Sequence, residues 1–211
     1  MTVPILLLHG LWSRGAEERL LCTRLTRYTG RTVERFAYRS MSRDFDVNVQ
    51  ALVDHLQHEA AAEIDLIGHS LGGLVVLAAL RSLPVGRARR VVLLGAPVGG
   101  SVSARRLARL GPVGRMLLGR CGAALADGDR QPAPGGAQIG IIAGDRAISM
   151  GRLLGKLGGP SDGTIRVDET RLPGASAHIV LPVSHTGMLF SNAVARAAGR
   201  FLETGRFDEA A

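Results

Sequence analysis

The sequence predicts a single α/β domain whose mostly parallel sheet of six strands is flanked by helices on both faces. Apolar runs of strand length alternate with longer stretches compatible with helices, an alternation typical of parallel β/α units. The chain has 211 residues, of which 46% are hydrophobic, so it can bury one sizeable core. No long polar linker divides it, and its apolar runs are far shorter than the roughly twenty residues of a membrane span.

Six apolar runs are expected to form the strands, and four longer stretches are expected to form helices. The expected strands are Val3–Leu8, Thr32–Tyr38, Ile64–Gly68, Arg90–Leu94, Gln138–Ala143 and Ala177–Leu181. The expected helices are Ala16–Tyr28, Val47–Ala62, Ser70–Leu83 and His185–Glu203. Pro84 ends the third of these helices, and Gly205 follows the last one as a residue typical of C-caps.

The most informative motif is the pentapeptide Gly68-His69-Ser70-Leu71-Gly72, which lies between the third expected strand and a helix. The pattern G-x-S-x-G suits a sharp turn, because the backbones approach so closely that only glycine fits at the flanking positions. Such a turn exposes the serine hydroxyl, so the motif predicts a nucleophile at Ser70. An alternative interpretation is that Ser70 caps the helix that follows, since serine is common at N-cap positions.

Chemically reactive residues follow four of the expected strands. His9-Gly10 follows the first strand, Ser70 the third, Asp145 the fifth and His185 the sixth. Ligands of an open parallel sheet bind beyond the carboxyl ends of its strands, so these residues are expected to share a site. A serine hydroxyl needs a neighbouring base to accept its proton, and His185 is the expected base.

On these residues the sequence resembles the α/β-hydrolase family, and most closely its small bacterial lipases and esterases. The order serine, acid, histidine along the chain is that of the family's catalytic triad. Larger members carry further strands before the one that ends in His-Gly, so this chain resembles a minimal, N-terminally shortened version. The matching segments, which together cover nearly the whole chain, are Leu8-His9-Gly10-Leu11, Ile67-Gly68-His69-Ser70-Leu71-Gly72-Gly73, Gly95-Ala96-Pro97, Ser161-Asp162-Gly163-Thr164-Ile165 and Ser184-His185-Thr186-Gly187-Met188.

Two aspartates compete for the role of the triad acid. Asp145 directly follows a strand, so its position points toward the site without further folding. The resemblance favours Asp162 instead, because lipase-like members place the acid in an Asp-Gly turn followed by two apolar residues. Asp162-Gly163-Thr164-Ile165 reproduces that pattern except for its threonine. We therefore expect Asp162 to be the acid, with Asp145 as the alternative and Asp168 as a weaker candidate.

The resemblance also implies two backbone N–H groups that stabilise the oxyanion formed on the attacked carbonyl. In this sequence these groups belong to Leu11 and Leu71. Leu71 begins a helix, where free N–H groups and the positive end of the dipole favour an anion. Four residues within or beside the matching motifs are expected to contact the substrate, and they are Trp12, His69, Val98 and Met188.

The segment Val98–Gly136 shows no strand pattern and is expected to form a cap-like or lid-like insertion within the single domain, residues 1–211. Its arginines alternate with apolar residues, which gives it a basic amphipathic character. One interpretation is a solvated helical face. The other is a lid whose apolar side covers an acyl pocket and whose arginines bind an anionic membrane or micelle surface.

Composition and spacing argue against several other functions. The net charge is +8, but all except one of the 26 basic residues are arginines spread along the chain, and aromatic residues make up only 4%. No nucleic-acid binding is therefore expected. The sequence contains no H-x-x-x-H, H-E-x-x-H or paired-cysteine pattern, so no metal and no cofactor is expected. The apolar N-terminus is interpreted as a strand rather than a signal peptide, and the two distant cysteines favour a reduced, cytoplasmic setting.

These observations together predict a serine hydrolase that cleaves carboxylic esters, with a small-molecule or lipid ester as its substrate. The acyl group would be transferred to Ser70 and then released by water, with His185 acting first as base and then as acid. One alternative is an acyltransferase or thioesterase with the same triad. A second alternative is a member of the fold that binds a ligand without catalysis.

Overall fold

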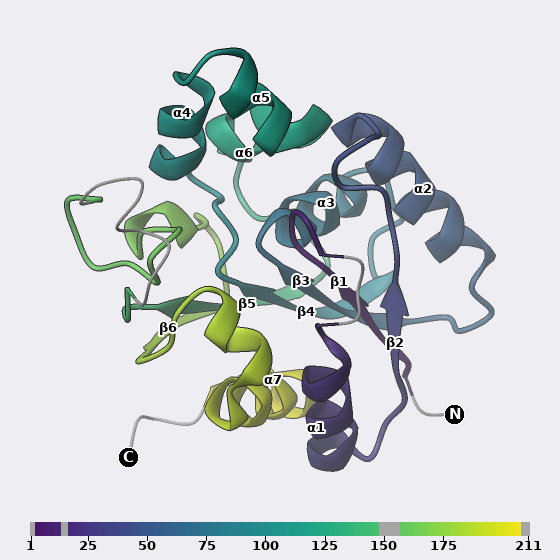
Figure 1. Cartoon of the computed structure of the whole chain (residues 1–211). Coiled ribbons are helices and arrows are strands. Elements are labelled where there is room, and N and C mark those ends of the chain that lie inside the picture. The colour runs from purple at the N-terminus through teal and green to yellow at the C-terminus, as the bar shows by residue number, and fades with distance from the viewer. Residues whose placement is uncertain (1–2, 14–16, 148–156, 208–211) are drawn as a thin grey trace.

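The computed structural model describes residues 3–13, 17–147 and 157–207, and it shows one six-stranded sheet between layers of helices (Figure 1). The strands are β1 (Ile5–Leu8), β2 (Val33–Phe36), β3 (Ile64–His69), β4 (Ala88–Leu94), β5 (Gln138–Gly144) and β6 (Ala177–Leu181). Their order in the sheet is β2-β1-β3-β4-β5-β6, and each neighbouring pair is parallel. The predicted fold class is confirmed, and the strand ends agree with the sequence prediction to within about two residues.

Successive side chains of each strand point to opposite faces of the sheet, so a strand buried on both faces reads as a continuous apolar run. In β1, Ile5 and Leu7 pack with α1 (Arg19–Thr29) and α7 (Asn192–Thr204) on one face. Leu6 and Leu8 pack on the other face with α2 (Phe45–His58) and α3 (Leu71–Leu80). Figure 1 shows these two helical layers below and above the sheet. None of the described helices has the length and apolar character that spanning a bilayer requires.

The last predicted helix is wrong in its first third. Instead of one helix over His185–Glu203, the structure has a short 3-10 helix, η4 (Thr186–Phe190), followed by α7. Ser191 separates the two elements, since its extended backbone ends the 3-10 helix and its hydroxyl accepts a hydrogen bond of 3.3 Å from the N–H group of Val194. A side-chain acceptor of this kind satisfies a free N–H group of the first helical turn, so α7 starts anew at this serine.

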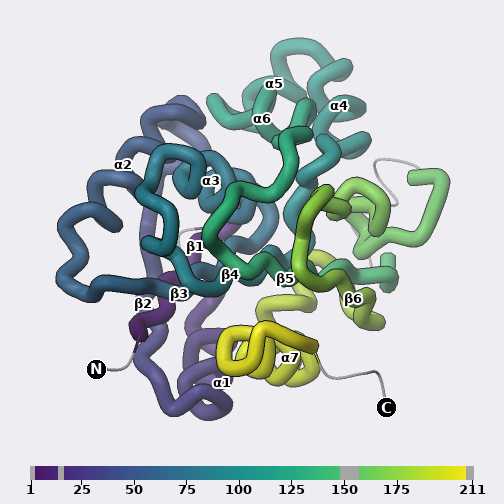
Figure 2. Tube along the Cα trace, turned by 180° about the vertical axis from the view of Figure 1, so that it is seen from behind, coloured from purple at the N-terminus to yellow at the C-terminus, as the bar shows by residue number. Residues whose placement is uncertain are grey.

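The segment between β4 and β5 contains short helices, which are α4 (Val102–Ala108), α5 (Pro112–Leu118), the 3-10 helix η1 (Gly119–Cys121) and α6 (Gly122–Asp127). We refer to residues 98–136 as the insertion. It lies outside the layer of α2 and α3, as Figure 2 shows from behind the molecule. Leu118 and Leu125 of the insertion pack with Leu71 and Leu74 in the first turns of α3. The insertion therefore covers the end of α3 that begins at the serine turn.

The strand order reverses direction between β1 and β3. From β1 the chain moves outward to β2 on one side, whereas β3 to β6 follow one another on the other side. In open α/β sheets the crevice beyond the carboxyl ends at such a reversal is the usual ligand site. Residues that follow β1 and β3 are thereby brought next to each other at this edge.

Candidate active site

Ser70 lies between the end of β3 and the start of α3, in a backbone conformation that non-glycine residues rarely adopt. Its φ is 53° and its ψ is −121°. The turn is tight, because a Cβ atom on Gly68 would lie 2.5 Å from the Cα of Gly73, and one on Gly72 would lie 2.6 Å from the carbonyl oxygen of His9. Strained backbone of this kind persists only where the surrounding structure enforces it, and it concentrates at functional sites.

The alternative interpretation of Ser70 as a helix N-cap is not supported. An N-cap residue normally has extended backbone dihedrals and a side-chain oxygen that accepts a hydrogen bond from the first turn. Ser70 has a positive φ, and its side chain makes no capping hydrogen bond. Its own N–H group instead donates to the carbonyl oxygen of Leu94 at 2.9 Å, which fixes the turn against β4.

His185 and the buried Asp162 form a pair, although 23 positions separate them in the sequence. Nδ1 of His185 lies 2.6 Å from Oδ2 of Asp162, and the exposed side-chain fractions are 13% and 1%. This contact occupies Nδ1, so Nε2 is the nitrogen that remains for a hydroxyl group. The His185 ring also lies against the ring of His69, the residue that precedes Ser70, with 4.9 Å between ring centroids.

The carboxylate of Asp162 is held in place by its own loop. Its Oδ1 accepts hydrogen bonds from the N–H groups of Thr164 at 2.9 Å and Ile165 at 2.7 Å. The backbone N–H of His185 donates to the carbonyl oxygen of Asp162 at 2.9 Å, so the two residues are joined through main chain as well as side chain. Because Oδ1 is occupied by backbone donors, the other oxygen is directed at the imidazole.

The insertion makes hydrogen bonds to the loop that contains Asp162, residues 160–169, which we call the acid loop. The hydroxyl of Ser103 in α4 donates to the carbonyl oxygen of Thr164 at 2.6 Å. The buried carboxylate of Glu169 accepts hydrogen bonds from the N–H groups of Val102 at 2.7 Å and Arg166 at 2.9 Å. Burial raises the pKa of Glu169, whereas these N–H donors act in the opposite direction. The base of α4 and the acid loop are therefore fixed to one another.

The other two aspartates considered from the sequence lie elsewhere. Asp145 follows β5 as predicted, but it is exposed, and its N–H donates to the carbonyl oxygen of Leu181. Asp168 is 54% exposed and pairs with Arg166. Of the three carboxylates, only that of Asp162 contacts the imidazole of His185. The geometry therefore favours the acid that the family resemblance selected over the one that strand position alone suggested.

Two glycines that sequence reasoning did not place in the site make room for the pair. A Cβ atom on Gly95 would lie 3.1 Å from Oδ2 of Asp162 and 3.1 Å from Nδ1 of His185, and the φ of Gly95 is +54°. A Cβ on Gly144 would lie 2.9 Å from the Cβ of Asp162. Their positions directly after two apolar runs, Arg90–Leu94 and Gln138–Ala143, were the signal in the sequence that could have identified them.

The predicted oxyanion donors, Leu11 and Leu71, follow β1 and β3, the two strands at the reversal. Among the described residues, neither N–H group donates a hydrogen bond. The loop at Leu11 is shaped by His9, whose Nδ1 lies 2.8 Å from the carbonyl oxygen of Gly10. The His9 ring stacks on Tyr38, whose hydroxyl donates to the carbonyl oxygen of His9 at 2.7 Å. These contacts indicate that His9 shapes the turn after β1.

The four predicted substrate contacts have very different surroundings. Trp12 is 53% exposed, has a φ of 63°, and donates its indole N–H to the carbonyl oxygen of Leu117 at 2.8 Å. Val98 and Met188 are 1% and 0% exposed and belong to the core, where Met188 and the Asp162–His185 pair surround Gly95. Side chains this buried present almost no surface to a ligand, so their positions suit packing, and a substrate contact stays a prediction. His69 is 6% exposed.

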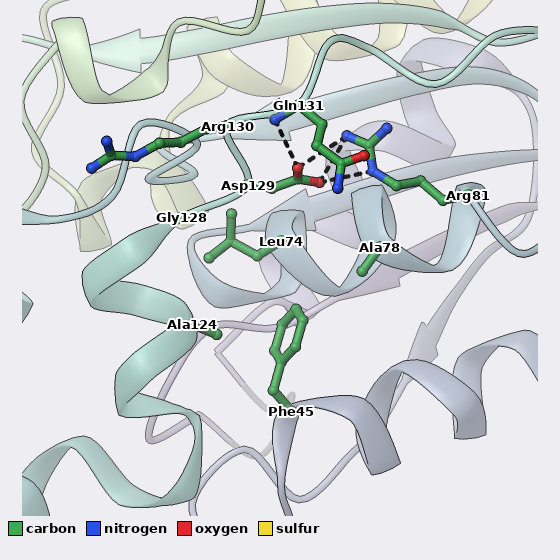
Figure 3. A pocket seen from close by; sticks show the side chains of 9 residues that line it. All are labelled: Phe45, Leu74, Ala78, Arg81, Ala124, Gly128, Asp129, Arg130 and Gln131. Atoms are coloured by element: carbon green, nitrogen blue, oxygen red, sulfur yellow. Dashed lines mark hydrogen bonds and ion pairs between the residues drawn. The ribbon is translucent and has the colours of Figure 1, made fainter.

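A cavity of about 310 Å³ opens beside α3, between α2 and α6 (Figure 3). Phe45, Leu74 and Ala78 contribute to its apolar wall, and Arg81 and Asp129 form an ion pair of 3.0 Å at its rim. None of the residues that line it is a predicted site residue. The cavity therefore shares no lining residue with the group formed by Ser70, His185 and Asp162.

Comparison with solved structures identifies the fold. Over 95% of this chain and 91% of the other, the structure matches the mature lipase BlEst2 of Bacillus licheniformis with a TM-score of 0.77 and 18% sequence identity. The propeptide form of that lipase matches with a TM-score of 0.81 and 19% identity, and there this chain spans 52% of the other. The metagenomic carboxyl esterase MGS0156 matches over 97% and 76% of the two chains, with a TM-score of 0.68 and 18% identity.

The chain thus has the α/β-hydrolase fold, as the resemblance in the sequence predicted. Residues 3–121 match the model of a family described as a domain of unknown function (DUF7379), and the chain belongs to this family. No curated protein matches the sequence. Since similar folds at this low identity host different activities, the function has to be argued from the site.

Proposed function

We propose that this protein is a serine hydrolase that cleaves carboxylic esters with Ser70, His185 and Asp162. The observation that supports the proposal most is the 2.6 Å contact between Nδ1 of His185 and Oδ2 of Asp162, made beside the strained turn that carries Ser70. A carboxylate in this position holds the imidazole in one tautomer and orientation. The nitrogen that faces away from the acid is then an acceptor for the serine proton.

The proposed reaction proceeds in two halves. Nε2 of His185 accepts the proton of Ser70 while Oγ attacks the ester carbonyl, and Asp162 stabilises the imidazolium that forms. The N–H groups of Leu11 and Leu71 stabilise the oxyanion. His185 then protonates the leaving alcohol, which leaves an acyl group on Ser70. Water attacks this acyl-enzyme by the same steps, and the free acid departs.

An apolar acyl group is the substrate half that we propose. Leu11 and Leu71, the proposed oxyanion donors, belong to an apolar cluster with Leu118 and Leu125 of the insertion. Apolar lining with a few polar groups is typical of small-molecule sites. The similar structures described as a lipase and a carboxyl esterase are consistent with such a substrate.

We further propose that the insertion is a cap that meets an anionic membrane or micelle surface. Four apolar side chains in and beside α5 are strongly exposed, and they are Leu110 (61%), Val113 (58%), Met116 (68%) and Leu117 (39%). Arg109 and Arg115 are exposed on the same segment. If these charges steer substrate, activity on anionic micelles should exceed that on neutral micelles and should fall with added salt. Activity independent of salt would leave only the solvated-face interpretation.

The decisive measurement is release of a chromogenic alcohol from esters of increasing acyl length by the wild type and by Ser70→Ala. We expect a burst followed by steady-state release that Ser70→Ala abolishes, whereas the control Ser82→Ala, at an exposed serine in the turn after α3, should behave as the wild type. Absence of Ser70-dependent release at every chain length would refute the proposal and favour a non-catalytic binding protein. Acyl transfer or thioester cleavage would appear as faster turnover with an added alcohol acceptor or with thioesters.

The setting that we propose is the reducing cytoplasm. Cys22 and Cys121 are both free thiols in the structure. Burial raises the pKa of Cys22 to about 11, and it also raises the pKa of Cys121. Thiols held in the protonated form are poor nucleophiles, so neither cysteine is proposed to take part in the reaction.

A further inference from the structure

His69 occupies the second position of the serine motif, yet the proposed reaction gives its side chain no task. The ring is buried, with only 6% of the residue exposed. Its Nε2 lies 3.2 Å from the backbone carbonyl oxygen of His185, and the two imidazole rings are tilted by 40° with their centroids 4.9 Å apart. The residue before the nucleophile is thus in direct contact with the residue that carries the base.

The partners of His69 define its tautomer. A carbonyl oxygen can only accept a hydrogen bond, so Nε2 must carry the proton and Nδ1 must be bare. Nδ1 is buried and has no hydrogen-bond partner among the described residues. Burial and the neighbouring His185 lower the pKa of His69 to about 3, so the ring is neutral near pH 7. A neutral donor with no accessible lone pair cannot serve as a second base.

The backbone of His185 is held from two sides by different loops. Its N–H group donates to the carbonyl oxygen of Asp162, which attaches it to the acid loop. Its carbonyl oxygen accepts from His69, which attaches it to the serine turn. The first contact orients the base relative to the acid. Only the second relates the base directly to the nucleophile.

We infer that His69 is a positioning residue that sets the separation of Ser70 and His185 through its Nε2 hydrogen bond to the His185 carbonyl. This inference rests on the proposed hydrolase function. It means that the position before the serine in G-x-S-x-G, which the motif leaves open, requires in this protein a hydrogen-bond donor that reaches the His185 carbonyl. If His69 merely filled space, an apolar ring would replace it without loss. If it acts through the hydrogen bond, the donor matters more than the ring.

Three substitutions of His69 separate these two roles. The amide nitrogen of glutamine reaches about as far as Nε2, so His69→Gln keeps the donor. His69→Asn has a donor too short to reach the carbonyl, and His69→Phe keeps the ring without any donor. His178→Phe is the matched control. That half-buried histidine also makes a hydrogen bond through Nε2, in its case at 2.9 Å from Oγ1 of Thr170, but it lies on β6.

Two readouts are needed for each variant. The first is kcat and KM on a chromogenic ester, where we expect kcat to fall about 10- to 100-fold with KM little changed in His69→Asn and His69→Phe, since misplacement of about 1 Å has such an effect. His69→Gln and His178→Phe should stay within about threefold of the wild type. The second is the proton NMR signal of the His185 Nδ1–H group in the free protein, which we expect to broaden in the two variants that lose the bond.

Wild-type kcat and an unchanged Nδ1–H signal in both His69→Asn and His69→Phe would overturn the inference. Loss of activity in His69→Gln equal to that in His69→Asn would also overturn it, because the donor would then be irrelevant. The Asn and Gln pair decides the matter if His69→Phe does not fold. Failure of the hydrolase proposal is recognised separately, since the wild type would then show no Ser70-dependent release while the NMR signal still tests the contact.

Discussion

Two buried aspartates, Asp65 and Asp162, have different surroundings. Asp65 lies near the beginning of strand β3, whereas Asp162 belongs to the candidate site beyond the end of this strand, where Ser70 follows. Asp65 accepts hydrogen bonds from Arg31 at 2.5 Å and from Arg89 at 2.6 Å, and it is 0% exposed. Asp162 is 2% exposed, but its partners are two backbone N–H groups and one imidazole. The two carboxylates are alike in burial and differ in the charge of their partners.

The charge of its partners determines what each carboxylate can contribute. The two arginines beside Asp65 are permanently cationic, so its charge is already compensated and the contact can only hold the fold together. The imidazole beside Asp162 can be neutral or cationic, so the carboxylate has stabilisation to offer when His185 takes up a proton. A buried aspartate with fixed cations supports structure, whereas one facing a titratable partner supports chemistry.

The largest expected effect comes from changing Asp162. Asp162→Asn should lower kcat by about 10⁴, because the amide favours the wrong tautomer of the base. Asp145→Asn and Asp168→Asn are the controls and should retain activity, as measured by ester release at saturating substrate. Should Asp145→Asn alone be crippled, the acid would have to be reassigned to the end of β5.

Changing Asp65 should have the opposite signature. Among the described residues, Asp65→Asn leaves the buried guanidinium of Arg31 with only Glu203 as a charged partner, and breaking a buried ion pair costs about 3–5 kcal/mol of unfolding free energy. Urea unfolding measures this loss, and kcat of the folded protein should stay near the wild-type value. Asp44→Asn removes the exposed pair with Arg120 and should change stability far less. A large fall in the kcat of Asp65→Asn with unchanged stability would contradict the contrast between Asp65 and Asp162.

Gly95 tests whether space around the Asp162–His185 pair is needed. A methyl group at this position would approach both partners to 3.1 Å, so Gly95→Ala should reduce kcat by about 100-fold. Gly86→Ala is a matched control, because Gly86 also has a positive φ, +88°, but nothing within 4 Å of the added methyl. Both variants share the backbone strain, which costs about 1–3 kcal/mol, and only the first should lose turnover. Equal kinetics in the two would remove Gly95 from the site.

The last expected effect concerns stability rather than turnover, and it is the pH dependence that His69 produces. Its pKa is about 3 in the folded protein and about 6.5 when unfolded, so the unfolded chain binds the extra proton between these values. The contribution of His69 to the free energy of unfolding is fully present above about pH 6.5. It is lost as the pH falls toward 3, by at most about 1.4 kcal/mol per pH unit. Urea unfolding between pH 4 and 7 should show a shallower decline for His69→Gln than for the wild type. Parallel curves would show that His69 is not held neutral by burial.

Local patterns in the sequence were sufficient for the sheet and for the positions of Ser70 and His185. Buried parallel strands are continuous apolar runs, and a serine turn requires glycines at fixed spacing, so both signals lie within a few adjacent residues. The break before α7 was also visible in principle, since Ser191 is a typical N-cap. The apolar periodicity on both sides of it concealed the break.

The contacts within the site depend on distant segments and were harder to predict. The choice between Asp145 and Asp162 depends on how the loop after β5 folds back, which strand position does not encode. The contact of His69 with the His185 carbonyl joins residues separated by 116 positions. Gly95 belongs to a segment that matches the family, but the need for glycine there arises from the closeness of Asp162 and His185, which lie on two other loops. Tertiary packing decides these features, so residue pattern alone does not reveal them.

Trp12 is the only tryptophan of the chain, and its indole N–H donates to the carbonyl oxygen of Leu117. It directly follows Leu11, a proposed oxyanion donor, while Leu117 lies in α5 of the insertion. Any displacement of α5 therefore either breaks this bond or pulls on the loop beside the nucleophile. The protein consequently carries an intrinsic fluorescent probe at the junction of the insertion and the loop of the proposed oxyanion donor Leu11, and its emission reports the state of that single junction without an added label.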